Sequence, residues 1–85
     1  MKYFVYILYS KSKDKYYTGY SKDADDRVLE HNAGSTPSTR PGIPWILVYK
    51  EELEDKSTAI KRELAIKKMK SKKYIQKLIG NCIND

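Results

Sequence analysis

Three blocks of apolar and aromatic residues along the chain predict β-strands. Residues 3–9 are apolar or aromatic at every position, which is typical of a strand that is covered on both faces and is therefore central in its sheet. Residues 15–20 predict a second strand, and the polar stretch 10–14 between the two is short enough to make them an antiparallel hairpin. Residues 45–50, which begin with the single tryptophan, predict the third strand.

A first helix is expected between the second and third strands. Ser21 is the expected N-cap, and the acidic residues of the first turn suit the helix dipole. Gly34 closes the helix, whose apolar stripe consists of Ala24, Val28 and Leu29. The polar loop 35–44 that follows holds all three prolines of the chain, and loops of this length often serve function.

Two further helices are expected near the C-terminus. Ser57 caps the first, whose apolar stripe is Ala59, Ile60, Leu64 and Met69. Ser71 starts the second, which ends at Gly80 and buries Tyr74, Ile75, Leu78 and Ile79. The order β-β-α-β-α-α predicts an α+β fold in which a small three-stranded antiparallel sheet is flanked by helices. We expect one domain over residues 1–80 and a C-terminal tail over residues 81–85.

The length and the cysteine content narrow the class of protein. A chain of 85 residues provides one small domain with a modest core, so we expect no second module that could read a long nucleic-acid site. Cys82 is the single cysteine, which excludes an intramolecular disulfide and a cysteine-based zinc site. The lack of a signal peptide and of a long apolar stretch predicts a cytoplasmic protein outside the membrane.

The positive charge is concentrated in one segment. The net charge is +6, yet residues 1–56 hold nine basic and nine acidic side chains. Residues 57–79 hold eight basic side chains against the single acid Glu63, and Asp85 brings the total back to +6. Such a segment is the electrostatic footprint of a polyanion such as nucleic acid. A lysine-rich helix face that only aids solubility has the same composition.

Several residues have side chains suited to chemistry on phosphates. Arg27 and His31 lie four positions apart and share one face of the first helix, on a flank beside the buried stripe. Arginine donates two hydrogen bonds to a phosphate, and neutral histidine accepts a proton near pH 7. A surface arginine paired with an acid, next to an incidental histidine, would give the same pattern. Glu63 is either a ligand of Mg²⁺, which commonly takes one or two carboxylates, or the partner of Lys67 in an i,i+4 ion pair.

The tyrosines and one glycine leave similar alternatives. Most of the eight tyrosines are expected to pack in the sheet, where aromatic residues are favoured. Tyr6 and Tyr17 lie on adjacent strands of the hairpin and could direct their hydroxyls toward one site. Gly19, inside the second strand, marks either a bulge or a close approach of the backbone to a ligand.

Together these features resemble the GIY-YIG nuclease family, and especially its small stand-alone bacterial members of the UvrC/intron-endonuclease (URI) type. Residues 4–6 and 17–19 stand where the family has its two tripeptide motifs. The other matching segments are 23–34, 40–41, 45–49 and 59–67. The resemblance covers residues 3–79, and its strength lies in the order and spacing of pieces that are weak singly.

The resemblance implies hydrolysis of a DNA phosphodiester with one metal ion. Tyr6 and Tyr17 would line the site, with Tyr17 close to the attacking water, and Arg27 would hold the scissile phosphate. His31 stands at a position that is a candidate general base, and Glu63 would hold Mg²⁺ or Mn²⁺. Further expected substrate-binding residues are Gly19, Asn32, Thr39, Arg40 and Lys67.

Two positions depart from the family pattern. Phe4 replaces the first glycine of the name motif, which stand-alone members often lack. Tyr20 follows Gly19 where repair-type members carry a lysine that is thought to help activate the neighbouring tyrosine. His31 is a candidate for that task, because its ordinary pKa of about 6.5 is closer to neutral than the value of about 10 for tyrosine.

Three functions follow from these observations. The leading hypothesis is a Mg²⁺-dependent endonuclease acting in repair or recombination on branched or single-strand-containing DNA, with a protein partner that supplies specificity. The alternative is a non-catalytic DNA-binding or adaptor module that retains the fold. A third is an interaction protein whose basic helix contacts an acidic partner. Metal dependence separates the first two, because a nuclease needs Mg²⁺ and Glu63, whereas a binder holds DNA equally well in EDTA.

Overall fold

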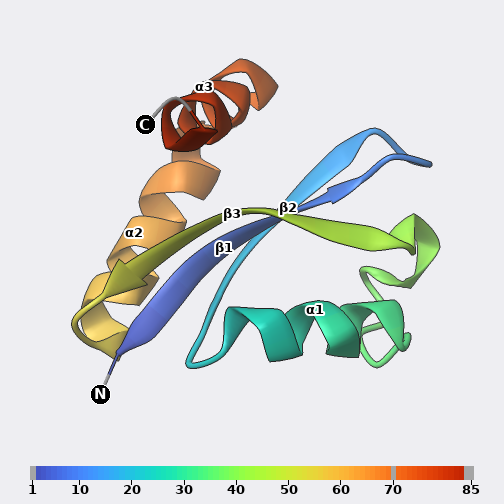
Figure 1. Cartoon of the computed structure of the whole chain (residues 1–85), viewed down its shortest axis with the longest axis horizontal. Coiled ribbons are helices and arrows are strands. Elements are labelled where there is room, and N and C mark those ends of the chain that lie inside the picture. The colour runs from blue at the N-terminus through green and yellow to red at the C-terminus, as the bar shows by residue number, and fades with distance from the viewer. Residues whose placement is uncertain (1, 70, 84–85) are drawn as a thin grey trace.

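The computed structural model describes residues 2–69 and 71–83, with side chains described as far as residue 80. Its elements are β1 (Tyr3–Ser10), β2 (Lys15–Ser21), α1 (Ala24–Asn32), a 3-10 turn η1 (Arg40–Gly42), β3 (Trp45–Leu53), α2 (Lys56–Met69) and α3 (Lys72–Ile83). The expected order β-β-α-β-α-α and the α+β class are confirmed. Figure 1 shows the three strands with α1 on one side and with α2 and α3 on the other.

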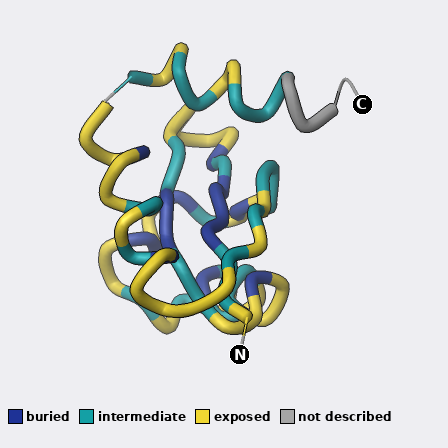
Figure 2. The backbone as a smooth tube through the Cα atoms, turned by 90° about the vertical axis from the view of Figure 1, so that its left-hand side faces the viewer, coloured by how far each residue is buried: buried dark blue, intermediate teal, exposed yellow. Residues whose placement is uncertain are grey.

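The strand β1 is the centre of the sheet, as the unbroken apolar run predicts. The strand order is β2-β1-β3 and both pairings are antiparallel. Residues 5–8 are at most 1% exposed, and Figure 2 shows the buried backbone gathered in the middle of the molecule. Because successive side chains point to opposite faces of a strand, β1 supplies a hydrophobic core on each side of the sheet.

The two cores hold different helices. On one face Val5 and Ile7 pack with Ala59 and Ile66 of α2, and α3 adds Tyr74, Ile75 and Leu78. On the other face Tyr6 and Leu8 pack with Ala24 of α1 and with Trp45, and the partly buried residues around them are Phe4, Tyr17, Val28, Ile43 and Leu47. The sheet is therefore a shared wall between two small cores, and both cores depend on β1.

The apolar stripes expected for the helices are partly wrong. Leu29 of α1 is exposed, as are Leu64 and Met69 of α2. The buried positions of α2 are Ala59 and Ile66, which lie seven positions apart on one helix face. Arg62 and Glu63 occupy the intervening turn of that inward face and are only partly exposed. The stripe of α2 was predicted on the wrong face because Arg62 and Glu63 are polar, whereas periodicity identifies an inward face by its apolar residues.

Two of the expected N-caps are also wrong. Asp23 rather than Ser21 caps α1, because its Oδ1 accepts a hydrogen bond from the Asp26 N–H at 3.0 Å. Asp55 rather than Ser57 caps α2, because its Oδ1 accepts from the Thr58 N–H at 2.8 Å. In both cases the cap is the residue whose side chain accepts from the amide three positions further on. Which residue can do this depends on the position at which the helix begins.

The C-terminal ends of the helices were predicted with mixed success. Gly34 follows α1 with a positive φ of 82°, and the Ser35 N–H donates to Glu30 O at 3.2 Å, as in a Schellman motif. Ser71 caps α3 as expected, since its Oγ accepts from the Tyr74 N–H at 3.1 Å. Gly80 does not end α3, which continues to Ile83. The side chain of Cys82 lies outside the described residues.

An ion pair fixes α2 on the sheet. Arg62 Nε donates to Glu51 Oε1 of β3 at 3.0 Å, and the Tyr49 hydroxyl donates to the same oxygen at 2.7 Å. Both charged side chains are less than one-third exposed, so the pair is screened less by solvent than a surface pair. This contact joins α2 to β3 at the residue next to Glu63.

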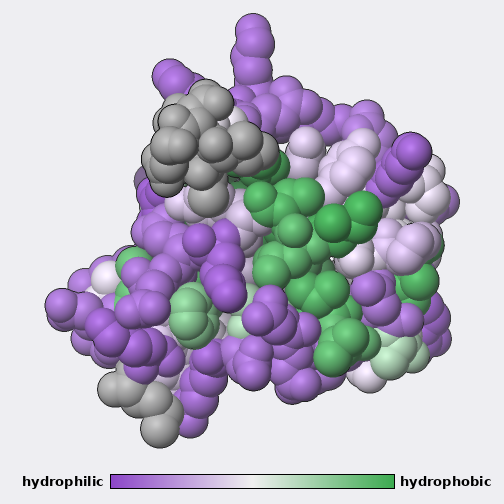
Figure 3. Space-filling model, in the orientation of Figure 1, coloured by the Kyte–Doolittle hydropathy of each residue, from purple (hydrophilic) through white to green (hydrophobic). Residues whose placement is uncertain are grey.

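The surface on the β3 side of the molecule is apolar. Figure 3 shows hydrophobic residues gathered over the region that β3 crosses in Figure 1, with hydrophilic residues around them. Ile46 of β3 is more than half exposed. Within residues 2–69 and 71–83, no helix combines the length and the apolar character that crossing a membrane requires.

Asn32 joins the end of α1 to the start of β3. Its Oδ1 accepts from the Trp45 N–H at 2.6 Å, and its Nδ2 donates to Trp45 O at 3.0 Å. The oxygen and the nitrogen of the side-chain amide are thus both used within the protein. They hold the backbone of Trp45, which is itself buried in the second core.

Replacing Asn32 by alanine is expected to destabilise the fold. Asn32→Ala leaves a backbone donor and acceptor without partners, which costs about 1–3 kcal/mol of unfolding free energy. Thermal unfolding measures this loss against Gln76→Ala, which removes an exposed amide of α3. Equal melting temperatures for the two variants would contradict the structural role of Asn32.

Candidate active site

A pocket of about 400 Å³ opens along β2, at one edge of the sheet. Its walls contain Tyr6 from β1, Tyr17 and Gly19 from β2, Arg27 from α1 and Glu63 from α2. The other lining residues are Tyr3, Tyr20, Ser21, Lys22 and Lys56. The tertiary structure therefore brings residues from four elements, on both faces of the sheet, to one opening.

Gly19 is needed because Tyr6 lies directly against it. The two residues are paired across β1 and β2. A Cβ atom at Gly19 would lie 2.6 Å from the Tyr6 hydroxyl oxygen and 2.8 Å from its Cζ, closer than such contacts occur. The group that approaches the backbone at Gly19 is therefore the Tyr6 side chain and not a ligand.

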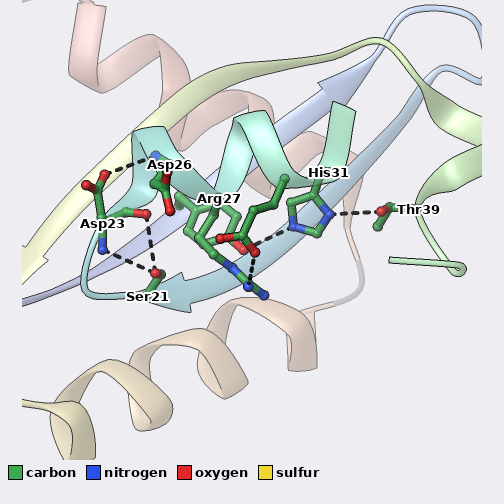
Figure 4. Close-up of polar contacts among 8 residues, drawn as sticks. Ser21, Asp23, Asp26, Arg27, His31 and Thr39 are labelled. Atoms are coloured by element: carbon green, nitrogen blue, oxygen red, sulfur yellow. Dashed lines mark hydrogen bonds and ion pairs between the residues drawn. The ribbon is translucent and has the colours of Figure 1, made fainter. Parts of the chain in front are cut away.

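A chain of hydrogen bonds runs from Tyr6 into the interior. The Tyr6 hydroxyl lies 3.3 Å from His31 Nε2, and His31 Nδ1 lies 2.8 Å from Thr39 Oγ1 (Figure 4). Thr39 Oγ1 donates its own proton to Thr36 O at 3.2 Å. It must then accept from His31, so we assign the proton of neutral His31 to Nδ1. Nε2 is left as an acceptor for the Tyr6 O–H.

Burial keeps both members of the Tyr6–His31 pair neutral near pH 7. Burial raises the pKa of the Tyr6 hydroxyl, while the nearby Arg27 guanidinium acts in the opposite direction. Burial also lowers the pKa of His31, and the positive charge of Arg27 lowers it further. His31 is 1% exposed and lies in the interior, not on the exposed flank expected from the helix pattern. It reaches the pocket through Tyr6.

Arg27 projects from the same side of α1 as His31 (Figure 4). Its Nη1 pairs with Glu30 Oε1 at 2.8 Å, so the ion pair considered for this residue exists. Its Nε is buried and has no hydrogen-bond partner among the described residues. The contact with Tyr6 raises the pKa of Arg27, so the guanidinium stays charged. The Arg27 side chain as a whole is 38% exposed and lines the pocket, so its guanidinium can donate to an anionic oxygen there.

Glu63 presents a mostly buried carboxylate to the pocket. Its side chain is 12% exposed and lies 3.4 Å from Lys67 Nζ, so the i,i+4 pair considered above is present as well. Lys67 Nζ also lies 5.9 Å from the centre of the Tyr17 ring. The described residues hold no group of three or more His, Cys, Asp or Glu side chains that could bind a metal by themselves. A single carboxylate still fits Mg²⁺, which keeps several waters and takes substrate phosphate.

The remaining predicted site residues do not line this pocket. Asn32 holds Trp45, as described above, and Thr39 is buried behind His31. Arg40 is exposed and donates to Gly34 O from both Nε and Nη2. Lys67 reaches the pocket only through its contacts with Glu63 and Tyr17.

Sequence reasoning missed two lysines of the pocket. Lys22 directly follows the second strand and precedes the cap of α1, so its place in the chain was a usable signal. Lys56 belongs to the neutral part of the chain and comes to the pocket only through the packing of α2.

Burial of neutral His31 predicts a loss of stability in mild acid. Its folded-state pKa lies below the value of about 6.5 in the unfolded chain, so the unfolded state binds more protons in that interval. The free energy of unfolding should therefore decrease as the pH falls from about 6.5 through the folded-state pKa of His31. Urea unfolding at several pH values between 7.5 and 5 measures this slope, which should be smaller in His31→Gln. The same slope in both proteins would show that His31 does not titrate in this way.

Comparison with known proteins places the chain in a family. A family profile described as the GIY-YIG catalytic domain matches residues 2–76. A UPF0213 protein of Staphylococcus saprophyticus is 40% identical over 77 residues, which is 88% of this chain and 92% of that protein. A UPF0213 protein of Staphylococcus epidermidis is 47% identical over 68 residues, or 78% of this chain and 80% of the relative.

The fold is also similar to a solved structure. The solution NMR structure of a UPF0213 protein from Bacillus halodurans matches with a TM-score of 0.59 and 32% sequence identity, and the match covers 94% of this chain and 84% of that one. The profile match spans most of the chain and includes the two strands, α1 and α2 that form the pocket. The chain belongs to the GIY-YIG family of nuclease domains.

Proposed function

We propose that this protein is a divalent-metal-dependent endonuclease that hydrolyses DNA phosphodiester bonds, in repair or recombination. The observation that carries the proposal is the meeting of Arg27 and Glu63 in one pocket with Tyr6 and Tyr17. Membership of the GIY-YIG family supports the nuclease class.

Arg27 and Glu63 have complementary roles in this proposal. Arg27 would donate to a non-bridging oxygen of the scissile phosphate and offset the charge that grows there. Glu63 would hold Mg²⁺ or Mn²⁺, which when bound supplies Lewis-acid polarisation of the phosphate. Lys22 and Lys56, at the same pocket, add positive charge for neighbouring phosphates.

Tyr6 and His31 form the proton path. Tyr6 lines the pocket, and its hydroxyl lies 3.3 Å from His31 Nε2, which accepts its proton in the tautomer assigned above. As Tyr6 takes a proton from the attacking water, it passes its own proton to Nε2, and His31 becomes an imidazolium. Thr39 accepts from Nδ1 throughout, which keeps the ring oriented. Tyr20 stands where repair-type members of the family carry a lysine. In this proposal buried His31 takes over the task of that lysine, and it acts through Tyr6.

One observation favours the non-catalytic alternative. Lys67 already pairs with Glu63, so a metal ion would have to compete with an internal cation. A protein that only binds DNA would use Arg27 and the lysines of the pocket and would need no metal. The two functions differ in their dependence on metal and on Glu63.

Metal-dependent cleavage is the first test. Labelled single strands, duplexes, flaps, forks and four-way junctions are incubated with Mg²⁺, Mn²⁺ or EDTA. Cleavage should require metal and should fall by about 10²-fold or more in Glu63→Gln, as when an electrostatic contact to the transition state is lost. Glu54→Gln, which neutralises an exposed carboxylate outside the pocket, should cleave like the unmodified protein. No cleavage of any substrate, with DNA binding unaffected by EDTA, would favour the adaptor function.

The pH–rate profile tests the proton path. The path requires neutral His31, so the cleavage rate should fall as the pH decreases through the pKa of His31, which lies below its ordinary value of about 6.5. His31→Gln should lower the rate by about 10²–10⁴-fold and should remove this acid limb. An acid limb that persists unchanged in His31→Gln would exclude His31 as the final proton acceptor.

A further inference from the structure

A second pocket, of about 330 Å³, adjoins the first. Tyr17 lines both pockets, so the two are neighbours on the surface. The other lining residues of the second pocket come from the β1–β2 hairpin, the loop after α1 and the start of β3: Lys13, Lys15, Tyr16, Ser38, Thr39, Pro41, Gly42 and Trp45. Apart from Thr39, which holds His31 from behind, the proposed reaction gives these residues no role.

The aromatic part of this second pocket is held rigidly. Trp45 Nε1 donates to Thr39 O at 2.7 Å, so the indole is fixed and its polar atom is satisfied. The ring also packs directly on Gly42, where any side chain would collide with it. Tyr17 meets Trp45 edge to face, with the ring centres 6.3 Å apart. Trp45 is only 7% exposed, so it supports the partly exposed ring of Tyr17, and aromatic rings held in this way are what unpaired nucleobases stack on.

The charged part of the pocket suits a phosphate. Lys13 and Lys15 are exposed, and none of the residues that line the pocket is acidic. Asp14, between them, has a positive φ of 51° and accepts hydrogen bonds from Tyr9 and from Lys72 of α3, at 2.9 and 2.7 Å. The Asp14 carboxylate is thus paired with Lys72 of α3. It therefore does not occupy Lys13 or Lys15, whose positive charges can attract a phosphate.

We propose that the second pocket binds the nucleotide next to the scissile phosphate, with its base against Tyr17 beside Trp45 and its phosphate at Lys13 and Lys15. This inference rests on the proposed function, which places the scissile phosphate at Arg27 in the first pocket. A strand crossing Tyr17 would put neighbouring nucleotides into the two pockets. A base paired within a duplex cannot enter, so this pocket selects a nucleotide that is unpaired or can be unstacked.

Trp45 provides the readout, because it is the single tryptophan and lines the pocket. Its fluorescence is followed in EDTA while a short oligothymidylate is added, and then a strand of the same length without bases. The oligothymidylate should quench the fluorescence and bind about tenfold more tightly than the abasic strand, because each stacked base strengthens binding. Free thymidine monophosphate should bind much more weakly than either strand.

Paired lysine variants test the charged part. Lys13→Gln/Lys15→Gln should weaken binding of the oligothymidylate about tenfold and reduce the salt dependence by about one unit per lost phosphate contact. Lys11→Gln/Lys73→Gln removes the same charge from exposed lysines outside both pockets and should have a clearly smaller effect. Because all these side chains are exposed, the variants should melt like the unmodified protein.

Several results would overturn the inference. These are equal affinity for the abasic strand, equal effects of the two lysine pairs, no change in Trp45 fluorescence, or free thymidine monophosphate binding as tightly as the strand. The binding measurements use EDTA and so do not depend on cleavage. A protein that binds as expected but cleaves nothing with Mg²⁺ would therefore refute the proposed reaction and leave the nucleotide site standing.

Discussion

The structure depends on the burial of β1 on both faces. Its alternate side chains supply the core under α1 and the core under α2 and α3, so neither helical layer has a hydrophobic base without it. A domain of this size has few apolar residues, and a central strand can bury all of its side chains because alternate ones enter different cores. The candidate site residues then lie at the edge of the sheet, along β2, where Arg27 of α1 and Glu63 of α2 line the same pocket.

The candidate site includes polar residues at helix positions that usually hold apolar ones. Arg62 and Glu63 stand on the inward face of α2, where apolar residues would stabilise the fold more simply. Arg62 offsets this by pairing with Glu51, and Glu63, the next residue, lines the pocket. Polar residues that break a hydrophobic pattern, and are held by specific partners, are typical of functional sites in small proteins.

A chain of hydrogen-bonded polar residues lies behind the pocket. Tyr6, His31 and Thr39 form one directed chain that ends on the Thr36 carbonyl. Because each member donates to the next, the tautomer of His31 follows from the position of Thr39. The loop after α1 therefore contributes to the site from behind, while its outer residues shape the second pocket beside Tyr17.

The sequence by itself determined the strands, their antiparallel hairpin, the central place of β1 and the glycine end of α1. These depend on runs of apolar residues and on single residues with special backbone freedom, which act locally. It also identified the family and five of the residues that line one pocket, because their order and spacing form a pattern; these are Tyr6, Tyr17, Gly19, Arg27 and Glu63. Only the tertiary structure decided which helix faces turn inward, that Asn32 and Thr39 are held within the protein, and that residues 13–17 and 38–45 enclose a second pocket. Each of these depends on contacts between elements far apart in the chain, and a hydrogen bond such as that of Asp23 or Asp55 depends on the register in which a helix begins.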